Sequence, residues 1–415
     1  MTAEKGFAGF RMAGDLCGPE PAATTREKPA EKAGFSVDNT FFTSAGDLDS
    51  FSLEGKEQVV IGRESCDLVA NRGHIAREHA RITMEDGSYF LTDLGSDAGT
   101  YLNDARVSGT VRLSASDRIS MADVNLLFTG NDVVYNKRAS ESRTEEVVSR
   151  TVGSRPVILD ADIRSKRVRD HNGSGVKELV RNVKLQLREG TLVALLGTAG
   201  TGKTTVMNCL NGMDLQGVEG SVYYRGVDLM QDFERMKYMI GSVPQKKVFH
   251  AAFTPEEEFR QSAILRLPAD TTDREIERRV DKTLEMLSMT GVRKSRNSTL
   301  SGGEQTRVNV GIELVADRDL LCLDEPDQGL SPNYKHELFQ IMGDLAHNYG
   351  KTVLSIIHDV SEIDLFDQVI ILAKVRGVGR LAFSGSPAQA REYFGVDIRD
   401  AYALLEREPE RFVKD

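Results

Sequence analysis

The chain carries a glycine-rich loop whose residue types and spacing suit the binding of phosphate groups. Residues 197–204 read Gly-Thr-Ala-Gly-Thr-Gly-Lys-Thr, and an apolar run at 191–196 precedes them as a buried strand would. Glycines allow backbone N–H groups to turn inward around a phosphate, and a helix beginning at Lys203 adds the positive end of its dipole. Lys203 can reach the β- and γ-phosphates, and the Thr204 hydroxyl can bind Mg²⁺, so the loop predicts a nucleoside triphosphate site. The residues expected to bind the nucleotide are Gly197, Thr198, Ala199, Gly200, Thr201, Gly202, Lys203, Thr204 and Thr205.

Two neighbouring carboxylates follow another apolar run further along the chain. Residues 320–323 read Leu-Leu-Cys-Leu and lead directly into Asp324 and Glu325. A strand here delivers Asp324 to the Mg²⁺ shell, whereas Glu325, one residue later, points elsewhere and can accept a proton from an attacking water molecule. The pair predicts hydrolysis of the bound nucleotide.

A second backbone anion site is predicted at Ser301, Gly302 and Gly303, which open a helical run. Small residues at a helix N-terminus leave N–H groups accessible to an anion. Because this sequence lies far from Lys203 along the chain, it need not serve the same nucleotide as the glycine-rich loop.

The elements that must position these residues fall into regions of different pattern. From 156 to 400, buried strands alternate with amphipathic helices, which predicts an α/β domain with a largely parallel sheet. Residues 34–130 show short alternating stretches separated by turns, and predict an all-β sandwich; Asp86-Gly87 between two such stretches indicates a hairpin. The expected remainder is a flexible tail over 1–33, a linker over 131–155 and a C-terminal extension over 401–415.

Composition and charge exclude several classes of protein. The 415 residues exceed what one hydrophobic core usually supports, so two or more domains are expected. The net charge of −10 is spread along the chain, which argues against a nucleic-acid binder with its basic stripe. No run approaches the roughly 18 apolar residues of a membrane-spanning helix, and the N-terminus lacks the apolar segment of a signal peptide. The 4 cysteines are widely separated, which indicates a reducing compartment and a cytoplasmic protein.

Residues 156–400 resemble the nucleotide-binding domain of ABC transporters, chiefly through Leu-Ser-Gly-Gly-Glu-Gln at 300–305. The resemblance implies a P-loop NTPase fold with a helical subdomain, ATP as nucleotide and Mg²⁺ as metal. It also implies that Gln245 senses Mg²⁺ and the γ-phosphate and that His358 is the switch histidine. The implied catalytic residues are Glu325, His358, Gln245 and Lys203, and the implied Mg²⁺ ligands are Thr204, Gln245 and Asp324.

The same resemblance implies a head-to-tail homodimer. ATP held by Lys203 of one subunit would be capped by Ser301 and Gly303 of the other, so that hydrolysis separates the two halves. The family's aspartate after the second carboxylate is Ser331 here, which weakens the case for tight cooperativity between the two sites. The stretch before the loop also lacks an aromatic residue for stacking on adenine. Val168 and His171 are the alternatives there.

The stretch 383–394 is similar to the end of the ATPase domain in subfamily G and related bacterial ABC proteins, in which a membrane domain usually follows. Because the sequence stops at Asp415, two alternatives are open: a separate transmembrane permease subunit, or a cut or standalone soluble domain. The first alternative, with exporter-type transport, would place the protein at the inner face of the plasma membrane.

Residues 55–130 resemble a forkhead-associated (FHA) domain, through Gly62-Arg63 and the stretches 75–82 and 93–103. FHA domains are β-sandwiches that bind phosphothreonine. The resemblance implies that Arg63 contacts the phosphate and that His79 ties the binding loops together.

This FHA-like region departs from the family where the ligand binds. The family's phosphate-binding serine and peptide-binding asparagine fall on Ala76 and Ala98, and each lost charge-assisted hydrogen bond removes roughly 1.5–3 kcal/mol. Arg63, Arg72 and Arg77 could compensate electrostatically. Two interpretations stay open: a phosphothreonine protein or peptide at Arg63 and Arg77, or a docking or dimer-building role. Candidate phosphothreonines within the chain are Thr24, Thr25, Thr144 and Thr151.

Taken together, these patterns predict the ATP-hydrolysing subunit of an ABC transporter, with an FHA module for regulation or assembly. One alternative is a soluble ABC-type ATPase that remodels a macromolecule. The other is a scaffold whose assembly is controlled by nucleotide. The presence of Lys203, Asp324, Glu325 and His358 argues against the scaffold.

Overall fold

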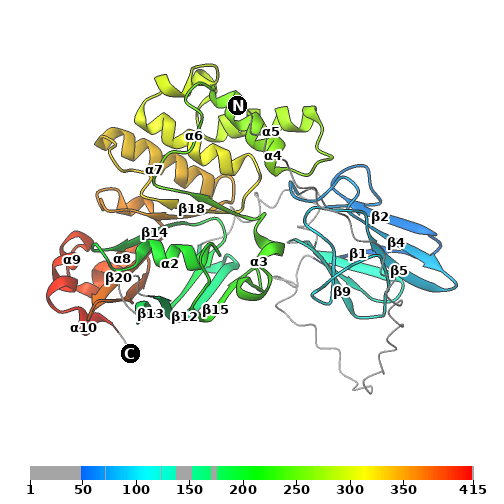
Figure 1. Ribbon diagram of the computed structural model, residues 1–415, viewed down its shortest axis with the longest axis horizontal. Coiled ribbons are helices and arrows are strands. Elements are labelled where there is room, and N and C mark those ends of the chain that lie inside the picture. Colours follow the sequence, from blue (N-terminus) through cyan, green and yellow to red (C-terminus); the bar gives the residue numbers. More distant parts are fainter. Residues whose placement is uncertain (1–47, 71, 123, 137–151, 170–174, 414–415) are drawn as a thin grey trace, which may run out of the picture. The chain divides into compact units, whose positions relative to one another are not determined.

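The computed structural model describes residues 48–70, 72–122, 124–136, 152–169 and 175–413 (Figure 1). The predicted tail, the start of the predicted sandwich and most of the predicted linker lie outside these residues. So do five residues with predicted roles, namely Thr24, Thr25, Thr144, Thr151 and His171.

Residues 48–136 fold into two β-sheets that enclose a hydrophobic core. One sheet has the order β1-β11-β10-β9-β6-β7, and the other has the order β3-β2-β4-β5-β8. Alternation drives this arrangement: in β10, Val124, Leu126 and Phe128 are buried while the residues between them are half-buried. The strands are β1 (Leu48–Ser52), β2 (Gln58–Gly62), β3 (Leu68–Val69), β4 (Ala80–Glu85), β5 (Ser88–Asp93), β6 (Tyr101–Leu102), β7 (Ala105–Arg106), β8 (Thr110–Arg112), β9 (Asp117–Met121), β10 (Val124–Phe128) and β11 (Asp132–Asn136).

The hairpin predicted at Asp86-Gly87 is present between β4 and β5. Asp86 has φ 46° and Gly87 has φ 73°, the left-handed conformations that a two-residue hairpin turn of this kind requires. The two strands pair from Ala80 opposite Asp93 to Glu85 opposite Ser88.

The sandwich extends past its predicted end at residue 130. Strand β11 lies in the segment predicted as linker and pairs antiparallel with both β1 and β10. Val133 is buried in the sandwich core and packs with its apolar residues. A short apolar strand is hard to separate from a polar linker by composition, and its pairing with β1 decides the matter.

The α/β region forms one ten-stranded sheet, in the order β16-β15-β12-β13-β21-β20-β14-β19-β18-β17. Strand β14 pairs in parallel with β19 and β20, and β18 pairs in parallel with β19 and β17. The long strands β12 and β13 pair antiparallel, and β15 extends that half. The predicted parallel sheet thus holds for the half that carries the glycine-rich loop, and the sequence pattern does not predict the antiparallel half.

The bounds of these elements follow the chain. The strands are β12 (Val157–Arg169), β13 (Val176–Arg188), β14 (Leu192–Gly197), β15 (Val218–Tyr224), β16 (Val227–Asp228), β17 (Ile240–Val243), β18 (Leu320–Asp324), β19 (Thr352–Ile356), β20 (Gln368–Val375) and β21 (Val378–Gly385). The helices are α2 (Lys203–Leu210), α3 (Leu229–Met236), α4 (Pro255–Arg266), α5 (Asp273–Met286), α6 (Gly302–Leu314), α7 (Pro332–His347), α8 (Pro387–Phe394), α9 (Ile398–Arg407) and α10 (Pro409–Phe412).

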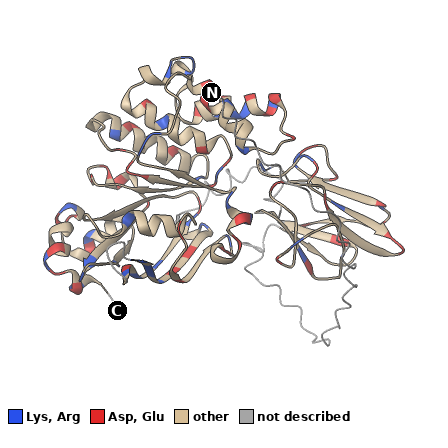
Figure 2. Ribbon diagram, viewed as in Figure 1, with Lys and Arg blue, Asp and Glu red and all other residues tan. Residues whose placement is uncertain are grey.

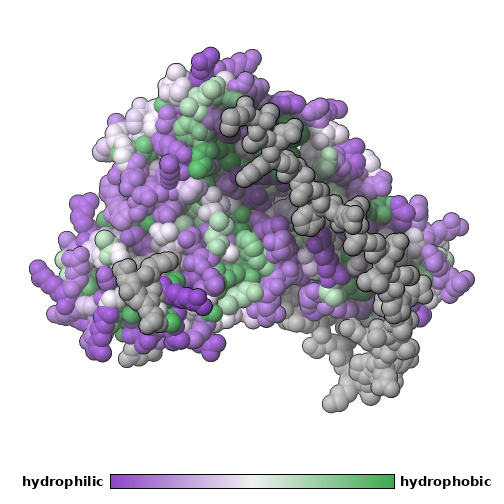
Figure 3. Space-filling model, viewed as in Figure 1, coloured by the Kyte–Doolittle hydropathy of each residue, from purple (hydrophilic) through white to green (hydrophobic). Residues whose placement is uncertain are grey.

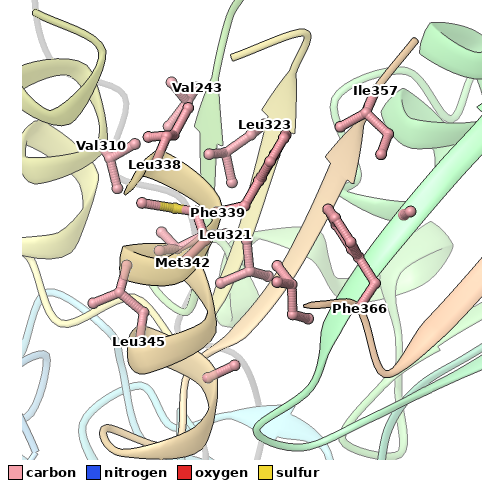
Figure 4. Close-up of a cluster of buried hydrophobic side chains, with 14 of the residues drawn as sticks. Val243, Val310, Leu321, Leu323, Leu338, Phe339, Met342, Leu345, Ile357 and Phe366 are labelled. Carbon is pink, nitrogen blue, oxygen red and sulfur yellow. The ribbon is translucent and has the colours of Figure 1, made fainter. Parts of the chain in front are cut away.

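A large core cluster fixes β18, which carries the two carboxylates at its end. Phe339 and Met342 of α7 face Leu321 and Leu323 of β18 (Figure 4). Phe339 also meets Phe366 edge to face, with ring centroids 5.2 Å apart. Each side chain buried in this way contributes about 1.5–3 kcal/mol, so the position of the strand end is strongly determined.

Helix α9 crosses residue 400, where the sequence predicts the start of a C-terminal extension. Ile398, Ala401 and Leu405 are buried at helical spacing and join the core cluster of the α/β region. Because α9 packs against this core without interruption, the described part of the extension continues the α/β domain.

Charged residues of both signs are interspersed along the described ribbon (Figure 2). On the face drawn in Figure 3, hydrophilic residues cover most of the described surface, with smaller hydrophobic patches between them. Within the described ranges, no helix combines the length and the apolar character needed to cross a bilayer.

Candidate functional site

The glycine-rich loop connects β14 to α2, and three of its glycines are required by its backbone. Gly197, Gly200 and Gly202 have φ of 152°, 73° and 85°, which L side chains rarely adopt. A Cβ at Gly197 would lie 2.8 Å from the Leu372 carbonyl oxygen, and one at Gly202 would lie 2.6 Å from Val180 Cγ1. The loop therefore keeps its shape only with glycine at these positions.

Lys203 begins α2 and folds back across this loop. Its Nζ donates to the carbonyl oxygens of Gly197, at 2.8 Å, and of Thr198, at 3.3 Å. Burial lowers the pKa of Lys203, against the opposing charges of Glu325 and Asp324. The ammonium is thus held by neutral carbonyl groups, at the rim of a ring of backbone that suits phosphate.

Thr204 and Asp324 meet although 120 residues separate them in the chain. The Thr204 hydroxyl donates to Asp324 Oδ2 at 3.4 Å. Burial, and then the charge of Glu325, raises the pKa of Asp324. A bound cation would favour the ionised carboxylate and so oppose this rise.

These donors fit Mg²⁺ bound together with a triphosphate. Among the described residues, no group of three or more His, Cys, Asp and Glu side chains could hold a metal ion on its own. Mg²⁺ usually takes one or two carboxylates and completes its shell with phosphate oxygens and water. One hydroxyl and one carboxylate beside a phosphate-binding loop match that requirement.

Glu325 is the point at which three predicted catalytic residues converge. Its Oε1 lies 2.6 Å from His358 Nε2, and its Oε2 accepts a hydrogen bond from Gln245 Nε2 at 2.8 Å. Gln328 Nε2 also donates to Oε2, at 3.2 Å. Glu325 itself has φ 49°, a left-handed backbone that turns its side chain away from that of Asp324. The carboxylate is therefore fixed by its neighbours and can accept a proton from a water molecule at its edge.

Gln328 is a functional residue that the sequence motifs miss. It lies three residues after Glu325 in the turn that follows β18, and no motif points to it. Only the chain reversal after β18 brings the two side chains together.

Ser301, Gly302 and Gly303 form the start of α6. Ser301 is its N-cap, and its hydroxyl forms a capping box with Glu304. Lys247 Nζ donates to the Gly302 carbonyl oxygen at 3.1 Å, and no sequence motif points to this lysine. Across the described ranges, no hydrogen bond joins these three residues to the loop 197–205 of the same chain.

The predicted phosphate contacts of the sandwich, Arg63 and Arg77, lie beside carboxylates of the α/β region. Arg63 Nε is 3.0 Å from Glu275 Oε1, its Nη2 is 3.4 Å from Asp270 Oδ1, and its Nη1 donates to the Ile75 carbonyl oxygen at 2.6 Å. Arg77 Nη2 lies 3.2 Å from Glu275 Oε2. Arg63 is thus enclosed by acceptors from two domains.

His79 joins two loops of the sandwich. Its Nδ1 accepts from the Ala76 N–H at 3.1 Å, and its Nε2 lies 3.2 Å from the Gly99 carbonyl oxygen. Burial lowers the pKa of His79, in spite of the Gly99 carbonyl and the charge of Asp93. The ring is therefore a buried connector of loops rather than a surface group.

Comparison with known proteins gives two family matches. Residues 180–328 match the ABC transporter family model, and residues 59–122 match the FHA domain model. The ABC transporter ATP-binding/permease protein Rv1747 of Mycobacterium tuberculosis is 30% identical over 354 residues, which are 85% of this chain and 38% of that protein. Protein white of Drosophila melanogaster is 33% identical over 230 residues, 52% of this chain and 32% of its own length. ABC transporter G family member 21 of Arabidopsis thaliana is 30% identical over 287 residues, 64% of this chain and 41% of its own length. The chain therefore spans less than half the length of each of these relatives.

Proposed function

Because the chain carries an ATP-binding and ATP-hydrolysing domain of the ABC transporter family behind an FHA domain, we propose that it is the ATP-hydrolysing subunit of an exporter-type ABC transporter. The observation that carries the proposal is the convergence of Gln245 and His358 on Glu325, next to Thr204 and Asp324. The relatives named above include an ATP-binding/permease protein and an ABC transporter of the G family, which supports coupling to a membrane domain.

The side chains divide the work of hydrolysis. The loop 197–205 and Lys203 bind the triphosphate, whose charge replaces the carbonyl groups that now hold the ammonium. Thr204, Asp324 and Gln245 hold Mg²⁺, which neutralises charge on the phosphates when bound. Glu325 takes a proton from the attacking water, and His358 fixes the carboxylate in position.

The second anion site completes the nucleotide site from another subunit. Ser301, Gly302 and Gly303 present the N-terminus of α6 and make no hydrogen bond to the loop 197–205 within the described part of their own chain. A head-to-tail homodimer gives each loop the α6 terminus of its partner. ATP then closes the dimer, and a separate transmembrane permease subunit receives the movement at the inner face of the membrane.

The decisive experiment replaces the proton acceptor with a residue of the same shape. We expect Glu325→Gln to bind ATP with Mg²⁺ normally and to lower the hydrolysis rate by about 10²–10⁴-fold, since general-base catalysis contributes on this order. Phosphate release from the purified chain measures the rate, and sedimentation with and without ATP measures dimerisation. The matched control is Glu392→Gln, an exposed carboxylate of α8.

Two results would contradict the proposal. Unchanged hydrolysis by Glu325→Gln would remove this residue from the mechanism. A monomer of Glu325→Gln at saturating ATP would remove the dimer, and the hydrolysis result would still stand on its own.

A further inference from the structure

The predicted phosphate-binding arginine of the sandwich already has anionic partners within its own chain. Arg63 is 6% exposed, and its guanidinium contacts Glu275 and Asp270, which lie at the N-terminus of α5 and in the loop before it. The backbone N–H of Arg77 donates to Asp270 Oδ2 at 2.5 Å. We call Asp270 and Glu275 the acidic pair.

The acidic pair is held in place before it meets the sandwich. Glu275 closes the capping box of α5: its Oε2 accepts from the Thr272 N–H at 2.8 Å and from the Thr272 hydroxyl at 2.6 Å. Its other oxygen, Oε1, is the one that meets Arg63 Nε. A carboxylate fixed by its own helix loses little conformational freedom on pairing, so the contact is preorganised.

A second set of contacts joins the same edge of the sandwich to the loop before β18. Arg72 Nη2 lies 2.6 Å from Asp319 Oδ2, and the Gly73 N–H donates to Asp317 Oδ2 at 3.2 Å. Burial would raise the pKa of Asp317, but the charges of Lys351, Arg279 and Arg72 hold it well below its ordinary value. The sandwich therefore bridges α5 and the loop that leads into the catalytic strand.

The loop that would grip a peptide in an FHA domain packs against the α/β region as well. Ala98, at the position of the family's asparagine, is 3% exposed and belongs to a core cluster of that region. The Tyr238 hydroxyl donates to the Asp97 carbonyl oxygen at 3.2 Å, and Arg235 of α3 lies 3.3 Å from Asp104. A side chain as large as asparagine at position 98 has no open space here, whereas alanine packs closely.

From these contacts we infer that the FHA-like sandwich takes the acidic pair of its own ATPase domain as its ligand, in place of a phosphothreonine peptide. The two positions at which the family's ligand-binding residues are lost, Ala76 and Ala98, are both buried. All three kinds of guanidinium nitrogen of Arg63 already have acceptors. A phosphate brought to Arg63 would also meet two carboxylates of like charge. The sandwich thus works as a clamp that ties α5 to the loop before β18.

Hydrogen exchange of the full-length chain tests the clamp directly, because the Arg77 amide is bonded to Asp270. We expect Glu275→Gln combined with Asp270→Ala to speed exchange across residues 72–79 about tenfold or more, since local opening controls exchange. Gln can still close the capping box at position 275, so α5 keeps its N-terminus. The matched control, Glu257→Gln with Asp273→Ala, changes the capping box of α4 and a carboxylate of α5 that contacts Arg260, and should leave residues 72–79 unchanged.

Coupling between the two sides separates a clamp from general loosening. Arg63→Gln alone should speed exchange in the same segment, and adding it to the acidic-pair variant should give little further effect. Wild-type exchange in the acidic-pair variant, or independent and additive effects, would overturn the inference.

A second measurement uses an immobilised library of phosphothreonine peptides with random flanks. We expect no retention of the wild-type chain that depends on Arg63. Retention that is lost in Arg63→Gln would overturn the inference and assign the arginine to phosphopeptides. Neither measurement involves ATP or a membrane subunit, so failure here would leave the proposed ATPase function untouched.

Discussion

The nucleotide loop and the FHA-like edge are both built around a cation meant for an anion, yet their cations have different partners. Lys203 is held by the neutral carbonyl groups of Gly197 and Thr198, whereas Arg63 is paired with the carboxylates of Glu275 and Asp270. Neutral acceptors leave the charge of Lys203 uncompensated, so an incoming triphosphate gains the full attraction. Carboxylates cancel the charge of Arg63 in advance. The partner of a cation, and not the cation itself, therefore decides whether a site stays available to a ligand.

The greatest change is expected at the cation with neutral partners. Lys203→Met should weaken ATP binding by about 10²–10³-fold, because it removes charge-assisted hydrogen bonds worth about 1.5–3 kcal/mol each. Equilibrium dialysis with labelled ATP measures the affinity. Arg63→Met is the control, and it should leave ATP affinity unchanged. Equal loss in both variants would mean that the two cations are not functionally distinct.

The next change is expected at the cation paired with carboxylates. Arg63→Met should destabilise the folded chain by about 3 kcal/mol, since it leaves buried carboxylates without their main partner. Urea unfolding followed by fluorescence or circular dichroism measures the change. Arg112→Met, an exposed arginine that contacts only the Ser88 hydroxyl among the described residues, should change stability by about 0.5 kcal/mol or less. A similar small value for Arg63→Met would show that its ion pairs contribute nothing.

A smaller effect is expected from acid. Burial tends to raise the pKa of Glu275, but hydrogen bonds from Thr272 and the charge of Arg63 lower it from 4.5 to about 2. Because the folded-state pKa lies below the unfolded one, the stabilisation is complete above about pH 4.5 and is lost as the pH falls toward 2.

Unfolding of wild type and Glu275→Gln at several pH values checks this dependence. The stability difference should be about 2 kcal/mol at pH 6 and should shrink steadily below pH 4.5. The other charged groups facing Glu275 are Arg63 and Arg77 of the sandwich, with Asp270 beside them. Glu257→Gln controls for the loss of a capping charge. A difference that stays constant with pH would contradict the ion pair as its source.

Several features of the protein depend only on contiguous residues and follow from the amino-acid order. Glycine at 197, 200 and 202 is demanded by the local backbone, and Asp86-Gly87 specifies its turn without help from distant chain. The family matches over residues 59–122 and 180–328 agree with the two domains predicted from such motifs. Because local conformational preference resides in neighbouring residues, these features are predictable from the sequence.

The meeting of distant residues depends instead on tertiary packing. No spacing predicts that Gln328 and His358 share the carboxylate of Glu325, or that β11 belongs to the sandwich. Arg63 and Glu275 are 212 residues apart, and Glu275 reads in sequence as an ordinary residue of a polar helix. Pairing of this kind follows from how sheets and helices pack, because packing sets distances that no local pattern encodes.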